Sequence, residues 1–145
     1  MKKTITCILL TAGLTGYLSA QTPVQDKSDK NSGKVIRMDK QMFLDNIFDY
    51  TSGSTNWKYK GEKPAVIDFY ATWCGPCRMV VPIVEEIAEE HPEIKVVKIN
   101  VQDEQELAAQ FQVSSIPTLM VVKNGKITNH AVGARPKAQI LAMLD

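Results

Sequence analysis

The sequence predicts an α/β domain with one mixed β-sheet of about five strands, flanked by four helices. The first observation is a nearly continuous apolar run over residues 64–71, which is typical of a strand covered on both faces and is followed directly by a helical pattern. The second is a pair of strand patterns, residues 118–123 and 126–132, joined by Asn124 and Gly125, the strongest short signal for a two-residue hairpin. Together they indicate a sheet that is parallel at first and antiparallel at the hairpin.

Before the apolar run, the sequence indicates a short strand over residues 35–38. Asp39 suits the N-cap of a helix that extends to about Tyr50. The apolar face of this helix is formed by Phe43, Leu44, Ile47 and Phe48. A longer loop rich in Ser, Gly and Lys follows over residues 51–63, and it contains Trp57 and Tyr59. We interpret these two aromatic residues as packing within the loop, in preference to substrate recognition.

After the apolar run, a long helix is expected from about Cys74 to Glu90, with Ile83, Val84, Ile87 and Ala88 facing inward. Pro82 lies inside it and must either kink the helix or remove a hydrogen bond. A buried strand over residues 94–101 and a short helix over residues 105–111 come next. Pro136 suits the first turn of a closing helix that runs to Leu144. The expected order of strands and helices along the chain is therefore βαβαβ, followed by αββα.

The overall composition and net charge indicate which classes of partner the protein can have. The chain has 145 residues, of which 44% are hydrophobic and 23% charged, as in an ordinary soluble domain. The formal net charge is +1, and no stripe of Lys or Arg stands out. We therefore expect no nucleic-acid partner.

The N-terminus has the features of a secretory signal peptide. Lys2 and Lys3 precede an uncharged apolar stretch over residues 5–18, and Ala20 offers a cleavage site. An uncleaved membrane anchor is the alternative, but the stretch falls short of the roughly 20 residues that span a bilayer. We expect a signal peptide over residues 1–20, a polar flexible spacer over 21–34, and one domain over 35–145. The mature protein would then be periplasmic or secreted, without stable membrane insertion.

The cysteines indicate a redox pair. Cleavage after Ala20 would remove Cys7 and leave only Cys74 and Cys77. Closing so short a loop stabilises a fold by about 2 kcal/mol, against about 4.7 kcal/mol for a loop of 100 residues. A structural zinc site needs four ligands, and only His91 and His130 are available besides the cysteines. Haem attachment needs His after the second cysteine, where the chain has Arg78. No metal or cofactor is expected.

The position of the pair explains how it could react. A cysteine at a helix N-terminus lies among unpaired N–H groups and at the positive end of the helix dipole, which both stabilise a thiolate. Gly75 permits a tight turn, and Pro76 costs no hydrogen bond in the first helical turn. We expect Cys74 to be the exposed nucleophile and Cys77, one turn deeper, to be the buried resolving thiol.

The segment from Asp68 to Cys77, which reads DFYATWCGPC, resembles the active-site segment of thioredoxins. The chain is similar to this family in four further segments, at residues 98–100, 115–118, 123–125 and 132–134, and the resemblance covers about residues 35–145. It implies the thioredoxin fold, protein disulfides as substrates, and a two-step exchange in which Cys74 attacks and Cys77 resolves the mixed disulfide. Tyr70 stands where thioredoxins more often have Trp.

The resemblance also implies roles for residues around the pair. Asp68 would accept the proton of Cys77, and its burial in an apolar strand should raise its pKa. Lys98 is interpreted as a partner that tunes Asp68; the alternative is a lysine at a strand end that reaches out to solvent. An X-Pro bond is cis in only about 5–6% of cases, but the resemblance implies a cis bond between Ile116 and Pro117, with the Ile116 backbone facing the sulfurs and pairing with substrate main chain. The apolar rim that meets substrates would comprise Trp73, Gly75, Pro76, Val101, Ile116, Pro117, Val132, Gly133 and Ala134.

The direction of electron flow is less constrained by the sequence. The Gly75 and Pro76 pair offers the thiolate no basic side chain, which favours the reducing end of the potential range. We therefore expect a monomeric reductant of exported protein disulfides that is recharged by a membrane electron donor. A disulfide oxidase or isomerase is the alternative enzyme, and a binding module with idle cysteines is the alternative of another class.

Overall fold

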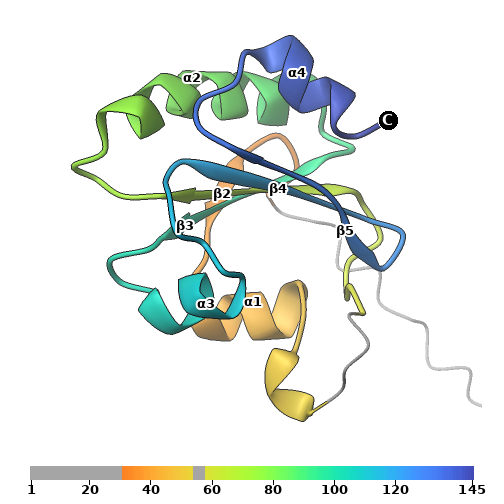
Figure 1. Ribbon diagram of the computed structural model, residues 1–145. Helices are drawn as coiled ribbons and strands as arrows, with labels where there is room; N and C mark the ends of the chain where they lie inside the picture. The colour runs from red at the N-terminus through yellow and green to blue at the C-terminus, as the bar shows by residue number, and fades with distance from the viewer. Residues whose placement is uncertain (1–30, 54–57) are drawn as a thin grey trace, which may run out of the picture.

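The computed structural model describes residues 31–53 and 58–145 and has the predicted order of elements (Figure 1). In chain order these are β1 (Val35–Arg37), α1 (Lys40–Asn46), a 3₁₀ turn η1 (Tyr50–Ser52), β2 (Ala65–Tyr70), α2 (Gly75–Glu90), β3 (Lys95–Asn100), α3 (Gln105–Gln110), β4 (Thr118–Lys123), β5 (Lys126–Val132) and α4 (Lys137–Ala142). The predicted signal peptide, most of the predicted spacer and Trp57 lie outside the described residues.

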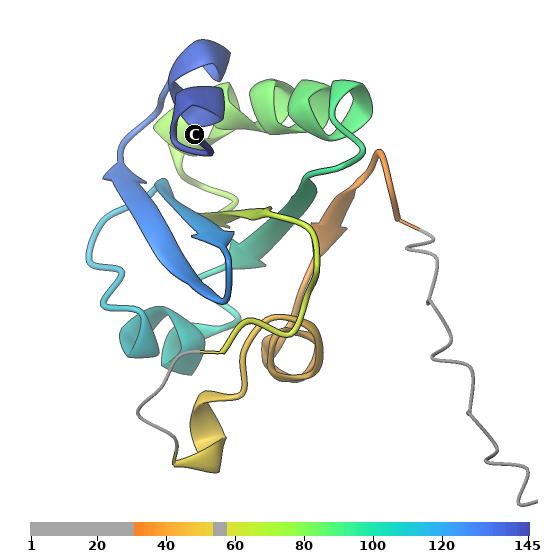
Figure 2. The same cartoon turned by 90° about the vertical axis from the view of Figure 1, so that its right-hand side faces the viewer.

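The five strands form one mixed sheet, as predicted, and their order in the sheet is β1-β3-β2-β4-β5. β3 pairs in parallel with both β1 and β2, while β4 is antiparallel to β2 and β5 is antiparallel to β4. Figures 1 and 2 show α2 and α4 on one face of the sheet and α1 and α3 on the other. Strand β2 lies at the centre of this sandwich, which explains its unbroken apolar sequence.

The residues of β2 alternate between the two faces, and all six are buried. Ile67 and Phe69 belong to the core cluster that includes Phe43 of α1 and Leu107 of α3. Val66 belongs to the cluster formed with Val84 of α2 and residues of α4. Because side chains alternate along a strand, Asp68 shares the α2 side with Val66. The fold thus places a buried carboxyl group on the side of the sheet that α2 covers.

Helix α1 begins as predicted but ends sooner. Asp39 is the N-cap and accepts a hydrogen bond from the Met42 backbone N–H at 2.7 Å. The expected end at Tyr50 is wrong, because α1 ends at Asn46. Lys60, in the loop between η1 and β2, satisfies carbonyl groups at the end of this helix. Its Nζ donates to the Leu44 carbonyl, and its backbone N–H donates to the Ile47 carbonyl. Helix α4 likewise ends at Ala142, short of the expected Leu144.

The β4–β5 connection is the predicted two-residue hairpin. Asn124 and Gly125 have φ angles of 52° and 82°, so both occupy the left-handed region that a type I′ turn requires. Tyr59 donates its backbone N–H to the Gly125 carbonyl at 3.2 Å and is buried in the core. For Tyr59 the prediction of packing is therefore confirmed.

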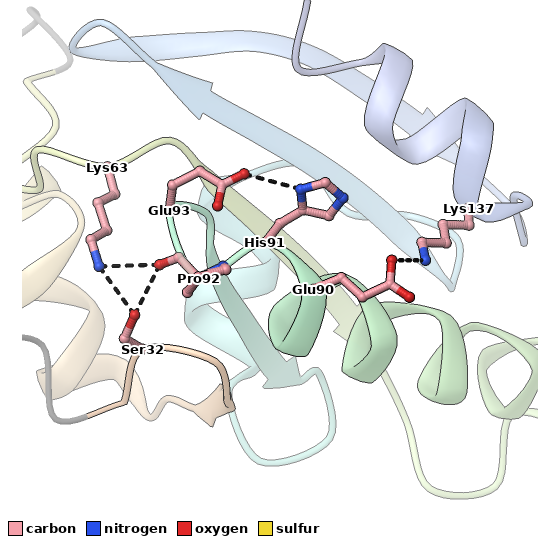
Figure 3. Close-up of polar contacts among 7 residues, drawn as sticks. All are labelled: Ser32, Lys63, Glu90, His91, Pro92, Glu93 and Lys137. Atoms are coloured by element: carbon pink, nitrogen blue, oxygen red, sulfur yellow. Dashed lines mark hydrogen bonds and ion pairs between the residues drawn. The ribbon is translucent and has the colours of Figure 1, made fainter.

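Polar contacts gather where α2 ends, remote from its first residue (Figure 3). Ser32 and Lys63 both donate to the Pro92 carbonyl, at 3.0 and 3.1 Å. From α4, Lys137 forms an ion pair with Glu90. The 16 residues of α2 extend about 24 Å at 1.5 Å per residue. These contacts therefore hold the C-terminal end of α2, at the opposite end of the helix from the two cysteines.

Candidate active site

The two cysteines lie where β2 passes into α2. Cys74 is the N-cap of α2, and its Sγ accepts a hydrogen bond from the Cys77 backbone N–H at 3.2 Å. The residues form a disulfide with Cα atoms 5.3 Å apart. The helix N-terminus thus presents an N–H group to the sulfur that would carry the thiolate in the reduced protein.

Both cysteines are buried. Cys74 is 4% exposed and Cys77 is 1% exposed. The expectation that Cys74 is an exposed residue is therefore wrong, although it remains the more accessible of the two. The cause lies in tertiary packing: the pair forms a cluster with Tyr70 and Ala71, and Ile116 packs against it.

The loop before β4 closes over the sulfurs. The peptide bond between Ile116 and Pro117 is cis, as the resemblance implies. The Ile116 carbonyl oxygen lies 3.8 Å from Cys74 Sγ. Two hydrogen bonds hold the loop, one from the Gly133 backbone N–H to the Pro117 carbonyl at 2.8 Å and one from Thr118 Oγ1 to the Ser115 carbonyl at 2.6 Å.

The predicted rim residues differ in how much surface they present. Trp73 and Val132 are large exposed apolar side chains, with 65% and 46% of their surface accessible. Gly75 and Pro76 are also exposed, whereas Pro117 is buried. The others are half-buried: Val101, Ile116, Gly133 and Ala134. Val101 and Ile116 contact the cysteine cluster, whereas Ala134 packs against the core beneath α2 and α4.

Sequence reasoning did not identify one exposed apolar residue beside the pair. Met79 is 65% exposed and lies three and four residues after Pro76 and Gly75 on α2, so it shares their helical face. The sequence contained one signal for this residue. Met79 lies outside the inward-facing stripe of α2, which comprises Val80, Val84 and Ile87. Packing in the core does not explain why an apolar residue lies on the outer face of this amphipathic helix.

Asp68 is fully buried, and neither of its carboxyl oxygens has a hydrogen-bond partner among residues 31–53 and 58–145. Burial raises the pKa of Asp68 to about 6, while the positive charge of Lys98 acts in the opposite direction. The predicted rise in pKa is confirmed. Such a carboxyl group can exchange a proton near neutral pH.

Lys98 lies in the middle of β3, in register with Asp68, and is 5% exposed. Its Nζ lies 4.4 Å from the centre of the Tyr70 ring, within cation–π range. Burial lowers the pKa of Lys98, and the negative charges of Asp68 and Glu85 oppose that shift. A central, buried position disfavours the alternative of a lysine at a strand end that reaches solvent.

Within residues 31–53 and 58–145, no three His, Cys, Asp or Glu side chains are grouped so that they could hold a metal ion. No helix in the same ranges has the length and apolarity needed to cross a membrane.

The geometry of a cysteine pair at a helix N-terminus, facing a cis-proline loop, agrees with comparisons to known proteins. The family model described as thioredoxin matches residues 53–145. The thioredoxins of Pyropia yezoensis and Haemophilus influenzae are 51% and 50% identical over 83 residues, and each match covers 57% of this chain and 78% of the relative.

Solved structures show the same likeness. A mutant thioredoxin from Halobacterium salinarum NRC-1 has a TM-score of 0.61 and 32% identity, over 78% of this chain and 89% of its own. A chain from the complex of ferredoxin:thioredoxin reductase with thioredoxin f2 has a TM-score of 0.63 and 26% identity, over 79% and 94%. With its redox-active pair at Cys74 and Cys77, the protein is a protein-disulfide reductase, and the chain belongs to the thioredoxin family.

Proposed function

We propose that this protein reduces disulfides of exported proteins, outside the cytoplasm, through the Cys74–Cys77 couple. The observation that carries the chemistry is the disulfide at the N-terminus of α2, with the Ile116 carbonyl 3.8 Å from Cys74 Sγ. The location rests on the sequence pattern of residues 1–20, with cleavage after Ala20.

The exchange proceeds in two steps that begin from the reduced protein. The Cys74 thiolate attacks one sulfur of a substrate disulfide, forming a mixed disulfide and releasing the other sulfur as a thiolate that takes up a proton. Cys77 then loses its proton and attacks Cys74 Sγ, which forms the Cys74–Cys77 disulfide and releases the second substrate thiol. Two electrons pass to the substrate. Cys74 attacks because it is the more accessible sulfur and accepts the Cys77 backbone N–H.

Asp68 takes the proton of Cys77 in this scheme. Its carboxyl group accepts no hydrogen bond from the described residues, and its pKa of about 6 keeps it ionised at neutral pH, where it can act as a base. Lys98, in register on the next strand, tunes this group by favouring its ionised form.

The substrate binds across the exposed apolar surface around Cys74. Trp73 and Val132 provide its largest accessible side chains, and Met79 extends it along α2. The main chain of Ile116 pairs with substrate main chain as an added strand would. An apolar surface joined to main-chain pairing suits many unrelated protein substrates.

The protein acts as a monomeric reductant recharged by a membrane electron donor. The Gly75 and Pro76 pair supplies no basic side chain to stabilise the thiolate further, which keeps the potential low. Equilibration with a glutathione redox buffer measures this potential directly. A potential near that of oxidising members of the fold would instead favour a disulfide oxidase or isomerase.

The decisive test of the chemistry is the Cys77→Ser variant, which can attack but not resolve. We expect it to accumulate mixed disulfides through Cys74 in cells, identifiable by mass spectrometry. Cys74→Ser is the matched control and should trap nothing. Links through other residues, or equal trapping by both variants, would contradict the assigned roles. If a double variant without both cysteines kept full biological function, a binding module would be the better description.

The proposed compartment is tested separately. N-terminal sequencing of the natural protein should give a start at Gln21, and fractionation should place it outside the cytoplasm. A start at Met1 in the membrane fraction would instead indicate a tethered enzyme, and a start at Met1 in the cytoplasm would contradict the proposal.

A further inference from the structure

A cavity of about 280 Å³ opens beside Cys77, between α2 and the strands at the β1 edge of the sheet. Its volume has room for several water molecules, since each occupies about 30 Å³ in the liquid. The polar or reactive side chains among its lining residues are Arg37, Tyr70, Thr72, Cys77, Arg78, Glu85 and Lys98. Three of them are cations, and Glu85 is the single carboxylate.

Within residues 31–53 and 58–145, the side chains of Arg37, Arg78 and Lys98 form no hydrogen bond or ion pair. Lys98 contacts the Tyr70 ring and lies near the charge of Asp68. Lys98 is 95% buried, since its exposed fraction is 5%. Its Nζ atom is not fully buried, so the ammonium group opens onto the cavity, where water or an anion can meet it.

The register of the sheet brings like charges together. Arg37 of β1 and Asp68 of β2 each pair with Lys98 of β3, so the three side chains form one row on the α2 face. Like charges directly opposite on neighbouring strands destabilise a sheet. Arg78 of α2 adds a third positive charge at the same cavity. The lining carries a net charge of +2, from three cations and Glu85, and protonated Asp68 beside Lys98 adds no charge to it.

We propose that this cavity binds a small oxyanion, held by the Lys98 ammonium and by the guanidinium groups of Arg37 and Arg78. Guanidinium groups hold oxyanions through paired hydrogen bonds, and an ammonium group in a low-dielectric wall adds a strong point charge. The bound anion would satisfy Lys98 and relieve the repulsion between Arg37 and Lys98. This binding site exists independently of the exchange reaction, so it does not rest on the proposed function.

The anion and the proton on Asp68 are linked. Ionised Asp68 adds a negative charge next to Lys98, so it weakens anion binding; by reciprocity, a bound anion holds Asp68 in its protonated form. Arg37, Arg78, Tyr70, Glu85 and Cys77 are the other charged or titratable groups that face Lys98. Because the pKa of Asp68 is about 6, binding should weaken as pH rises through that value.

The test is titration of the full mature protein with sodium sulfate, whose charge is constant from pH 5 to 8. Sodium chloride at matched ionic strength is the reference, and NMR follows the backbone amides and the Tyr70 ring. We expect saturable shifts confined to the cavity, with several-fold tighter binding at pH 5 than at pH 8. Arg37→Gln and Arg78→Gln should each weaken binding about tenfold, as the loss of one charge-assisted hydrogen bond implies.

Matched variants separate a site from a general charge effect. Lys126→Gln removes one exposed cation at the distant hairpin and should leave sulfate binding unchanged. Arg37→Lys keeps the charge and should retain part of the affinity, which excludes a folding defect as the cause. Shifts that chloride reproduces, or that all variants show equally, would overturn the site. Saturable binding elsewhere on the protein would overturn it as well.

Discussion

A single carboxyl group, Asp68, ties the stability of the protein to its proposed chemistry. It is fully buried, has no hydrogen-bond partner in the described part of the chain, and has its pKa raised to about 6 from 3.8. A raised carboxyl pKa means that the folded state disfavours ionisation. The stability from this group is therefore fully present below pH 3.8 and is lost as pH rises through 6. A shift of about 2 units corresponds to about 3 kcal/mol at higher pH.

We predict that Asp68→Asn stabilises the protein at pH 8 by up to about 3 kcal/mol and slows release of the mixed disulfide. Asn has the shape of protonated Asp, which equally lacks hydrogen-bond partners in this site. Denaturant midpoints from pH 4 to 9 give the first quantity, and the pH profile of disulfide reduction gives the second. A variant that is no more stable at pH 8 and equally fast would show that Asp68 is an ordinary residue.

We predict that Lys98→Met moves the Asp68 transition to higher pH, because it removes the cation that favours the ionised carboxylate. The onset of activity with rising pH should move in the same direction. NMR titration of the Asp68 carboxyl carbon measures the first effect directly. Lys126→Met, at the exposed start of β5, is the matched control and should leave both transitions in place. An unchanged Asp68 titration in Lys98→Met would contradict the tuning role.

The roles of single residues could be predicted where the neighbouring sequence indicates them. The cysteine pair and Asp68 are identifiable because each breaks a pattern: two cysteines open a helix, and one carboxylate interrupts an apolar strand. The burial of Cys74 was not predictable, since it depends on Ile116, which lies 42 residues away in the chain. Met79 was overlooked because helical periodicity identifies core residues and gives no reason for an exposed one.

At the scale of elements, two glycines allow a clean test of turn chemistry. Gly125 has a φ of 82°, whereas Gly75 has no positive φ, and a Cβ at either position would meet nothing within 4 Å. We predict that Gly125→Ala destabilises the fold by about 1 kcal/mol, through backbone conformation alone. Gly75→Ala should be neutral or slightly stabilising. Thermal or denaturant unfolding of both variants decides this, and equal losses would contradict the assigned turn.

Elements with strong local signals were predicted almost to the residue. Both strands of the hairpin have their predicted bounds, and α2 starts one residue after the predicted Cys74. The end of α1 was misjudged because nothing near Asn46 in sequence stops a helix. Its last carbonyl groups are instead satisfied by Lys60, from the loop that follows. Termination there is a tertiary event, which local propensity does not encode.

For the molecule as a whole, the two ends of α2 have different roles. The N-terminal end carries the disulfide and the exposed apolar side chains. The C-terminal end is fastened to the chain before β1 by Ser32, to the loop before β2 by Lys63, and to α4 by Lys137 (Figure 3). These contacts lie at the opposite end of a helix about 24 Å long, so they share no residue with the disulfide.

We predict that the reduced protein keeps this fold and is less stable than the oxidised protein by about 2 kcal/mol. The disulfide closes only a four-residue loop, from Cys74 to Cys77, so it restricts the unfolded chain little. The core clusters on both faces of the sheet involve no cysteine, and they hold the fold in either state. Denaturant unfolding with and without a reductant measures the difference, with Cys74→Ser as the control that reductant should not affect. Loss of far-UV circular dichroism on reduction would contradict this account, because it would make the disulfide a structural clamp.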